Sequence, residues 1–229
     1  MLTWHGKRGA SSTALAMAVL VAVSMVLSAY VMDFSQAEGD DERVLRIGFM
    51  EKVDSLNPNV GLTDASWTLY GLVYDCLQAV GNDLESTPNL ALDWNIAEDY
   101  EPYGSAWEFS ITPNAQWHDG EPLTADDVAF TINLNAEYFT QMWAYQPYTY
   151  YMDYAEKVDA DTVRIHFYDR KTVQPMSVAF ADSLFIPIMP KHLLQDMTVG
   201  DIGFNWIGAF EGYDPPMVGT GPFMATEDI

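Results

Sequence analysis

Cysteine is almost absent from this chain. Cys76 is the single cysteine in 229 residues, so an intramolecular disulfide framework and a cysteine-based zinc site are both excluded. It lies in an apolar helical pattern, which favours a buried and inert thiol. No cysteine closes the apolar run near the N-terminus, so the lipid-anchoring cysteine of a lipoprotein is missing as well.

The chain also has few basic residues. Lysine and arginine total 10 against 33 aspartates and glutamates, which gives a formal net charge of −23. Lys7 and Arg8 lie before position 33, where no acidic residue occurs, so the remainder has 8 basic and 33 acidic residues and a charge of −25. Such a surface repels nucleic acid and anionic lipid head groups. A saline habitat and the ordinary acidity of extracellular proteins both remain open as its origin.

Catalytic fingerprints are missing too. No G-x-S-x-G, phosphate-binding loop or dinucleotide motif occurs. His118 beside Asp119 could suggest a catalytic or metal pair, but zinc needs three or four ligands, and neighbours in a turn rarely converge on one atom. Asp126 and Asp127 point about 100° apart on a helix, so they do not flank a substrate. We therefore expect no enzyme, no metal and no cofactor.

One long apolar run is present at residues 10–32, where no charged residue occurs. Its densest part, Thr13–Met32, is twenty residues long, and a helix of that length matches the ~30 Å hydrocarbon core of a bilayer. The positive-inside rule places residues 1–9 in the cytoplasm and the chain after Asp33 outside. We predict a transmembrane anchor at the extracytoplasmic face of the cell membrane. A cleaved signal peptide with its site at 35–37 stays open, and the product would then be secreted or periplasmic.

An acidic linker is expected at residues 33–42, and residues 43–229 then mix strand and helix patterns. Trp107, Phe109 and Ile111 alternate with polar residues, as in a half-buried strand. Other elements are expected as strands at 43–49, 154–159 and 162–168, helices after Asp64, after Thr124, at 172–181 and at 192–197, an extended stretch at 186–190 and a tight turn at 219–222. The fold class is α/β in a mixed α+β arrangement.

A long ungapped stretch resembles a known signature. Residues 107–130 read WEFSITPNAQWHDGEPLTADDVAF, which is a W-x-F strand, a turn, an aromatic-H-D-G turn and P-L-T-A-x-D-V opening a helix. This resembles family 5 of the extracellular solute-binding proteins, the oligopeptide, dipeptide and nickel binders of ABC importers. Further matches follow in the family's order at residues 53–58, 88–94, 158–165, 187–192 and 218–223.

The physics of this signature is structural. The Trp107 strand packs one face, and Gly120 supplies the positive φ that its turn needs. Thr124 and Asp127, three residues later, predict a helix start of the capping-box type. None of these residues has to touch a ligand.

The resemblance implies a periplasmic-binding-protein-like class II fold, of which residues 43–229 would be an incomplete N-terminal lobe. It implies two-lobe closure on a peptide or another small solute, and delivery to the permease subunits of an ABC importer without covalent chemistry. The membrane is reached only through the N-terminal segment, and nucleic acid is not a partner. A membrane-anchored extracellular hydrolase and a ligand-sensing receptor with the same fold are the alternatives.

Gly61, Leu62, Thr63 and Asp64 are the candidate ligand-binding residues. In peptide-binding members the loop after the first turn lines the cleft and meets peptide backbone, and the resemblance carries this onto these four positions. The alternative is a plain helix-entry loop with Asp64 as the cap. The aromatic-rich stretch at 142–154 could form a stacking surface, although packing is the favoured explanation.

Overall fold

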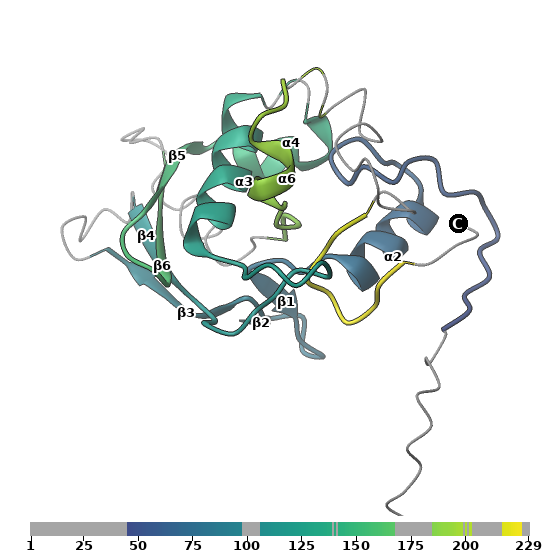
Figure 1. Ribbon diagram of the computed structural model, residues 1–229, viewed down its shortest axis with the longest axis horizontal. Helices are drawn as coiled ribbons and strands as arrows, with labels where there is room; N and C mark the ends of the chain where they lie inside the picture. The colour runs from purple at the N-terminus through teal and green to yellow at the C-terminus, as the bar shows by residue number, and fades with distance from the viewer. Residues whose placement is uncertain are drawn as a thin grey trace, which may run out of the picture. The chain divides into compact units, whose positions relative to one another are not determined.

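The computed structural model describes residues 45–97, 106–138, 140, 142–167, 185–198, 200, 202 and 217–225 (Figure 1). The chain divides into two compact units, Met1–Gly48 and Phe49–Ile229. Of the first unit only residues 45–48 are described, and they form neither helix nor strand. All helices and strands that the structure describes belong to the second unit.

The larger sheet is antiparallel, with the strand order β3-β4-β6-β5. Its strands are β3 (Ala91–Ile96), β4 (Ala106–Ile111), β5 (Met152–Lys157) and β6 (Thr162–Phe167). In the middle of the sheet Trp107 lies opposite Ile165, and Phe109 lies opposite Val163. The predicted hairpin is confirmed, except that its first strand begins at Met152 and ends at Lys157.

Strand β4 has the predicted alternation. Trp107, Phe109 and Ile111 are buried, Glu108 is half-buried and Ser110 is exposed. One face of the strand therefore turns to the core, as the period of two requires.

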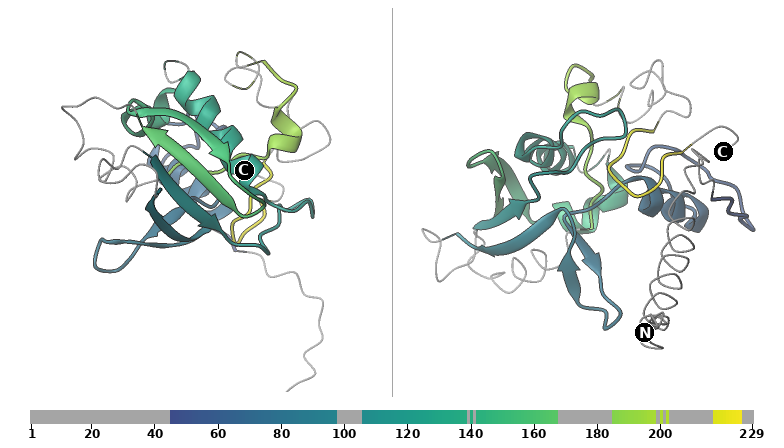
Figure 2. Two further views of the ribbon diagram at one scale, coloured as in Figure 1. Left: turned by 90° about the vertical axis from the view of Figure 1, so that its left-hand side faces the viewer. Right: turned by 60° about the horizontal axis from the view of Figure 1, so that its bottom comes forward.

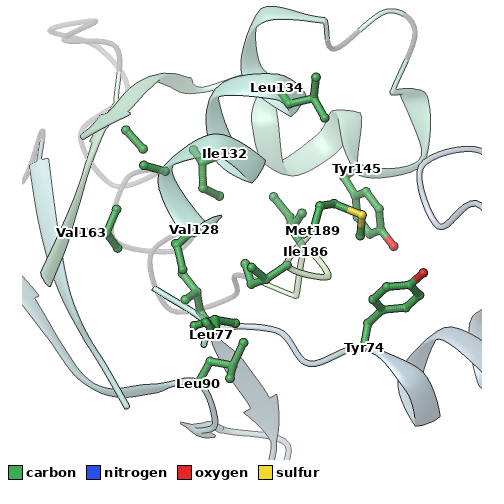
Figure 3. Close-up of a cluster of buried hydrophobic side chains, with 14 of the residues drawn as sticks. Tyr74, Leu77, Leu90, Val128, Ile132, Leu134, Tyr145, Val163, Ile186 and Met189 are labelled. Carbon is green, nitrogen blue, oxygen red and sulfur yellow. The ribbon is translucent and has the colours of Figure 1, made fainter. Parts of the chain in front are cut away.

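Helix α3 (Ala125–Glu137) covers one face of this sheet by packing on β5 and β6 (Figures 1 and 2). Its start is the predicted capping box, because the Asp127 carboxylate accepts hydrogen bonds from the backbone N–H and the hydroxyl of Thr124, both at 2.9 Å. Val128 and Ile132 are fully buried, and Figure 3 shows them near Val163 of β6. The apolar stripe of α3 thus closes the core over the sheet.

The remaining elements surround this core. They are α2 (Asp64–Val73), the hairpin of β1 (Gln78–Val80) and β2 (Ser86–Pro88), η2 (Trp143–Tyr145), α4 (Gln146–Thr149) and α6 (Lys191–Leu194). Residues 185–190 form neither helix nor strand, and Ile186, Ile188 and Met189 lie fully buried. Their backbone is held by the chain around it, since Met189 N donates to Thr131 Oγ1 at 2.8 Å. The stretch predicted as extended at 186–190 therefore runs through the core.

The strand predicted at 43–49 is wrong over residues 45–49, which adopt no regular structure. A strand is stabilised by a hydrogen-bonded neighbour, and no pairing with these residues occurs in the ranges that the structure describes. The apolar residues of this segment matched the composition of a strand without supplying a partner strand.

The glycines predicted to form a tight turn at 219–222 lie against the backbone at the end of α2. Gly221 N donates to Val73 O at 2.9 Å and Phe223 N donates to Leu72 O at 3.1 Å, so this segment runs beside the end of α2 (Figure 1). A Cβ on Gly219 would lie 1.9 Å from Val73 O. Glycine is needed here for close approach of two backbones rather than for a positive φ.

The anchor or signal segment at 10–32, the linker and the helix expected at 172–181 lie outside the described residues. None of the helices within the described ranges has the length and hydropathy that a membrane span requires.

Candidate functional site

The loop between residues 54 and 63 is organised by one carboxylate. Asp54 accepts hydrogen bonds from the hydroxyl of Ser66 at 2.6 Å and from the backbone N–H groups of Leu62 at 3.0 Å and Thr63 at 3.3 Å. The Ser66 bond, and after it the two backbone bonds, lower the pKa of Asp54 from 3.8 to about 2 against the opposing effect of desolvation. The carboxylate therefore stays ionised at neutral pH and can accept these hydrogen bonds.

The N-cap of helix α2 lies one residue before the expected cap, Asp64. Thr63 is the N-cap, with extended backbone (φ −79°, ψ 151°), and its Oγ1 accepts a hydrogen bond from Ser66 N at 3.2 Å. The prediction of Asp64 as the cap is wrong, because Asp64 is already the first helical residue. Its exposed carboxylate lies instead where the helix dipole favours negative charge.

Gly61 is buried against a tyrosine. A Cβ at this position would lie 2.0 Å from the hydroxyl oxygen of Tyr70. That hydroxyl lies 2.7 Å from Ser55 O and 3.1 Å from Asn57 O, the two carbonyls at the start of the loop. Gly61 thus sets the path of the loop and offers no side chain to a ligand.

The loop and the first turns of α2 expose apolar, aromatic and acidic side chains. Leu62 is 62% exposed, and Trp67, one turn into α2, is 41% exposed. The Trp67 ring meets the ring of Tyr145 edge-on with centroids 5.5 Å apart. Of the four candidate residues, Leu62 and Asp64 are accessible, Thr63 is half-buried and Gly61 is buried. The sequence analysis did not predict this role of Asp54, although the residue lies within the family match at residues 53–58.

The signature turn makes its contacts with the distant segment 217–223. Because Nδ1 of His118 accepts from Gly219 N at 3.3 Å, Nε2 carries the proton and donates to Gly221 O at 2.9 Å. Asp119 pairs with His192 at 2.9 Å, so the two neighbouring side chains do not converge. Gly120 has the predicted positive φ of 91°. The expectation of a structural role for this turn is confirmed.

The two aspartates of α3 also have separate partners. Asp126 contacts Lys157 at 2.6 Å and Lys191 at 3.5 Å, and the first of these contacts is the main cause that lowers its pKa. Asp127 faces the helix start and accepts a hydrogen bond from Lys191 N at 3.0 Å. They do not form a carboxylate pair across a substrate. Among the residues that the structure describes, no three histidine, cysteine or acidic side chains gather as a metal site.

The aromatic stretch divides between packing and exposure. Tyr145 is 1% exposed and belongs to the core, whereas Tyr150 and Tyr154 are 48% and 43% exposed. Tyr154 stacks on the His166 ring, with centroids 4.2 Å apart and planes 12° apart. The packing explanation therefore holds for Tyr145, whereas Tyr150 and Tyr154 are exposed.

Cys76 follows the end of α2 and is not part of a helix. Burial, with a smaller effect of Asp75, raises its thiol pKa to about 12. The thiol therefore stays neutral, but Cys76 is half-buried and not fully buried as expected.

A family comparison identifies the chain. The profile described as bacterial extracellular solute-binding proteins, family 5 (middle), matches residues 85–228. The chain belongs to this family. A binding protein of Brucella melitensis is 30% identical over 194 residues, which are 79% of this chain and 28% of that protein. The dipeptide-binding protein DppE of Bacillus subtilis is 30% identical over 95 residues, which cover 42% of this chain and 17% of DppE.

Solved structures share the fold. The oligopeptide-binding protein AppA of Bacillus subtilis, in complex with a nonapeptide, has a TM-score of 0.58 at 24% identity, over 76% of this chain and 32% of AppA. NikZ of Campylobacter jejuni, in complex with Ni(L-His), has a TM-score of 0.56 at 23% identity, over 77% and 32%. The mixed α/β fold therefore matches that of periplasmic binding proteins. The chain spans about 28% of the length of the first curated relatives that it matches.

Proposed function

We propose that this chain is part of the solute-capturing component of an ABC importer and that its solute is a peptide. The observation that carries the proposal is the family 5 match over residues 85–228. The solute class is supported by DppE, named for dipeptides, and by AppA, solved with a nonapeptide. The peptidoglycan-binding protein YepA of Agrobacterium fabrum, 28% identical over 77% of this chain, favours fragments of peptidoglycan as the second candidate solute.

In this proposal residues 43–229 form an incomplete N-terminal lobe of class II type, and a second lobe closes over the ligand. Residues 10–32 attach the protein to the extracytoplasmic face of the membrane or act as a cleaved signal, with residues 1–9 in the cytoplasm and 33–42 as the linker. The length of the apolar run and the charges that flank it support this arrangement. Permease subunits then receive the solute.

Residues 61–64 line the cleft in this proposal, with unequal roles. Leu62 and Asp64 face solvent and would meet the ligand, whereas Gly61 and Thr63 set the shape of the loop. Asp54 holds the N–H groups of Leu62 and Thr63 before any ligand arrives. A loop ordered in advance loses less conformational entropy on binding, so affinity rises.

The test uses the purified full-length protein and a panel of ligands: a dipeptide, a nonapeptide, a disaccharide-peptide fragment of peptidoglycan, and nickel with histidine. Calorimetry should detect a peptide-containing ligand, and Leu62→Ala should weaken its binding about tenfold, as the loss of a buried apolar contact does. Leu92→Ala, at a residue of β3 that is 54% exposed, is the matched control and should bind as the parent does.

Binding of nickel–histidine alone would overturn the peptide assignment. Turnover of a ligand would overturn the binding role as a whole. Equal ligand affinities of the Leu62 and Leu92 variants would contradict the proposal that residues 61–64 line the cleft. The proposed class of solute would not be affected.

A further inference from the structure

Six buried side-chain polar atoms have no hydrogen-bond partner among the described residues, and three of the six lie in neighbouring segments around the end of α2. These three are Oδ1 of Asn59 and the hydroxyl oxygens of Tyr74 and Tyr145. Their residues are 0%, 2% and 1% exposed, so bulk water does not reach them. Buried polar atoms in native proteins are almost always hydrogen-bonded to protein or to ordered water.

These atoms come from three segments that meet. Tyr74 directly follows α2, Tyr145 ends η2, and Asn59 lies in the turn before the candidate loop. Ala144 N lies 3.3 Å from Asn59 O, which brings that turn next to Tyr145. Figure 3 shows the Tyr74 and Tyr145 rings entering from different elements with their hydroxyl groups pointing toward each other.

Both hydroxyl groups remain protonated. Burial is the main cause that raises the pKa of Tyr74 and of Tyr145 well above 10, and proximity of Tyr74 adds to the rise at Tyr145. Each hydroxyl can therefore donate one hydrogen bond and accept others, whereas Oδ1 of Asn59 can only accept. Nδ2 of Asn59 is already used, since it donates to Asn57 Oδ1 at 3.1 Å.

Tyr70 shows that the same region can satisfy a tyrosine directly. Its hydroxyl reaches two backbone carbonyls, Ser55 O at 2.7 Å and Asn57 O at 3.1 Å. Tyr74 and Tyr145 have no such carbonyl among the described residues. The difference points to a small polar molecule that meets both hydroxyl groups.

We propose that Asn59, Tyr74 and Tyr145 enclose a binding site for one buried water molecule. The water accepts a hydrogen bond from each tyrosine hydroxyl and donates to Oδ1 of Asn59, which is the number of bonds that a buried water typically makes. It joins the end of α2, η2 and the turn that precedes residues 61–64. This inference does not depend on the identity of the solute.

The test begins with a high-resolution crystal structure of the full-length protein without variants. Electron density for an ordered water within hydrogen-bond distance of Tyr74 Oη and Tyr145 Oη would support the site. A direct hydrogen bond between the two tyrosines, with no water beside them, would overturn it. This measurement does not require any variant to fold.

Denaturant unfolding of hydroxyl deletions gives the second measurement. Tyr74→Phe and Tyr145→Phe should each lower the folding equilibrium constant about tenfold, and the double variant should lose less than the product, because both bonds end on one water. Tyr150→Phe, at a residue that is 48% exposed, is the control for loss of a hydroxyl group. Single variants as stable as this control would contradict the site.

Discussion

The sheet with α3 and the loop that leads into α2 are held in place by different forces. Around β4 the contacts are apolar side chains and strand pairing, with Phe109 and Ile132 fully buried. Between residues 54 and 66 the contacts are polar, and one carboxylate accepts hydrogen bonds from three residues. The first region, the scaffold, is therefore stabilised mainly by burial of apolar side chains, whereas the second relies on the hydrogen bonds of Asp54.

The largest effect should come from opening the scaffold. Phe109→Ala removes a ring from the fully buried middle of the sheet and should lower the free energy of unfolding by about 3–5 kcal/mol. Denaturant unfolding of the purified protein measures this loss. Ser110→Ala, at the exposed neighbour on the same strand, should change stability little. Similar losses in the two variants would mean that β4 does not divide core from solvent.

A smaller effect is expected where the segment 217–223 meets α2. Gly219→Ala forces a methyl group against Val73 O and should cost about 1–3 kcal/mol of unfolding free energy. Gly71→Ala is the matched control, because open space surrounds that position within α2, and alanine should add about 0.5–1 kcal/mol. Thermal unfolding of both variants checks the pair. A Gly219 variant as stable as the parent would contradict the close approach of the Gly219 and Val73 backbones.

The smallest effect on stability should come from the loop. Asp54→Asn removes the charge from the hydrogen bonds to residues 62, 63 and 66, and because Asp54 is exposed the cost should be about 1 kcal/mol. The folded pKa lies below the ordinary value, so the carboxylate stabilises the protein above pH 3.8, and this contribution is lost as the pH falls toward about 2.

Unfolding curves at neutral and acidic pH check this sign. The stability difference between the parent and Asp54→Asn should shrink over that acidic interval. A difference that grows on acidification would contradict the account of Asp54. If the loop lines the cleft, ligand affinity should fall in this variant by more than its small stability loss explains.

The scaffold could be predicted because its signals are local. The alternation around Phe109 and the pairing of Thr124 with Asp127 are properties of neighbouring residues, and the structure has both where they were expected. The family signature at residues 107–130 lies in this region and consists of the same kind of local pattern. Short-range patterns give element type well and element ends less well, as the shift of β5 to Met152 shows.

The candidate site was less predictable because its contacts are not local. Asp54 and Ser66 are twelve residues apart, and no periodicity links a carboxylate to a hydroxyl in the helix that follows it. The close approach of Gly219 to Val73 is likewise invisible in a list of turn residues. Leu84 is a further case, since its φ of 67° places a leucine where the chain normally uses glycine or asparagine.

The contacts of His118 with Gly219 and Gly221 also set an order on folding. They join residues 101 and 103 positions apart, and Leu72 and Val73 receive their hydrogen bonds from the same late segment. During synthesis on the ribosome, the end of α2 therefore leaves the exit tunnel long before its covering segment exists. Closing so long a loop is slow relative to local structure. The contact between residues 217–223 and the end of α2 should therefore be the last part of this unit to become protected from proteases.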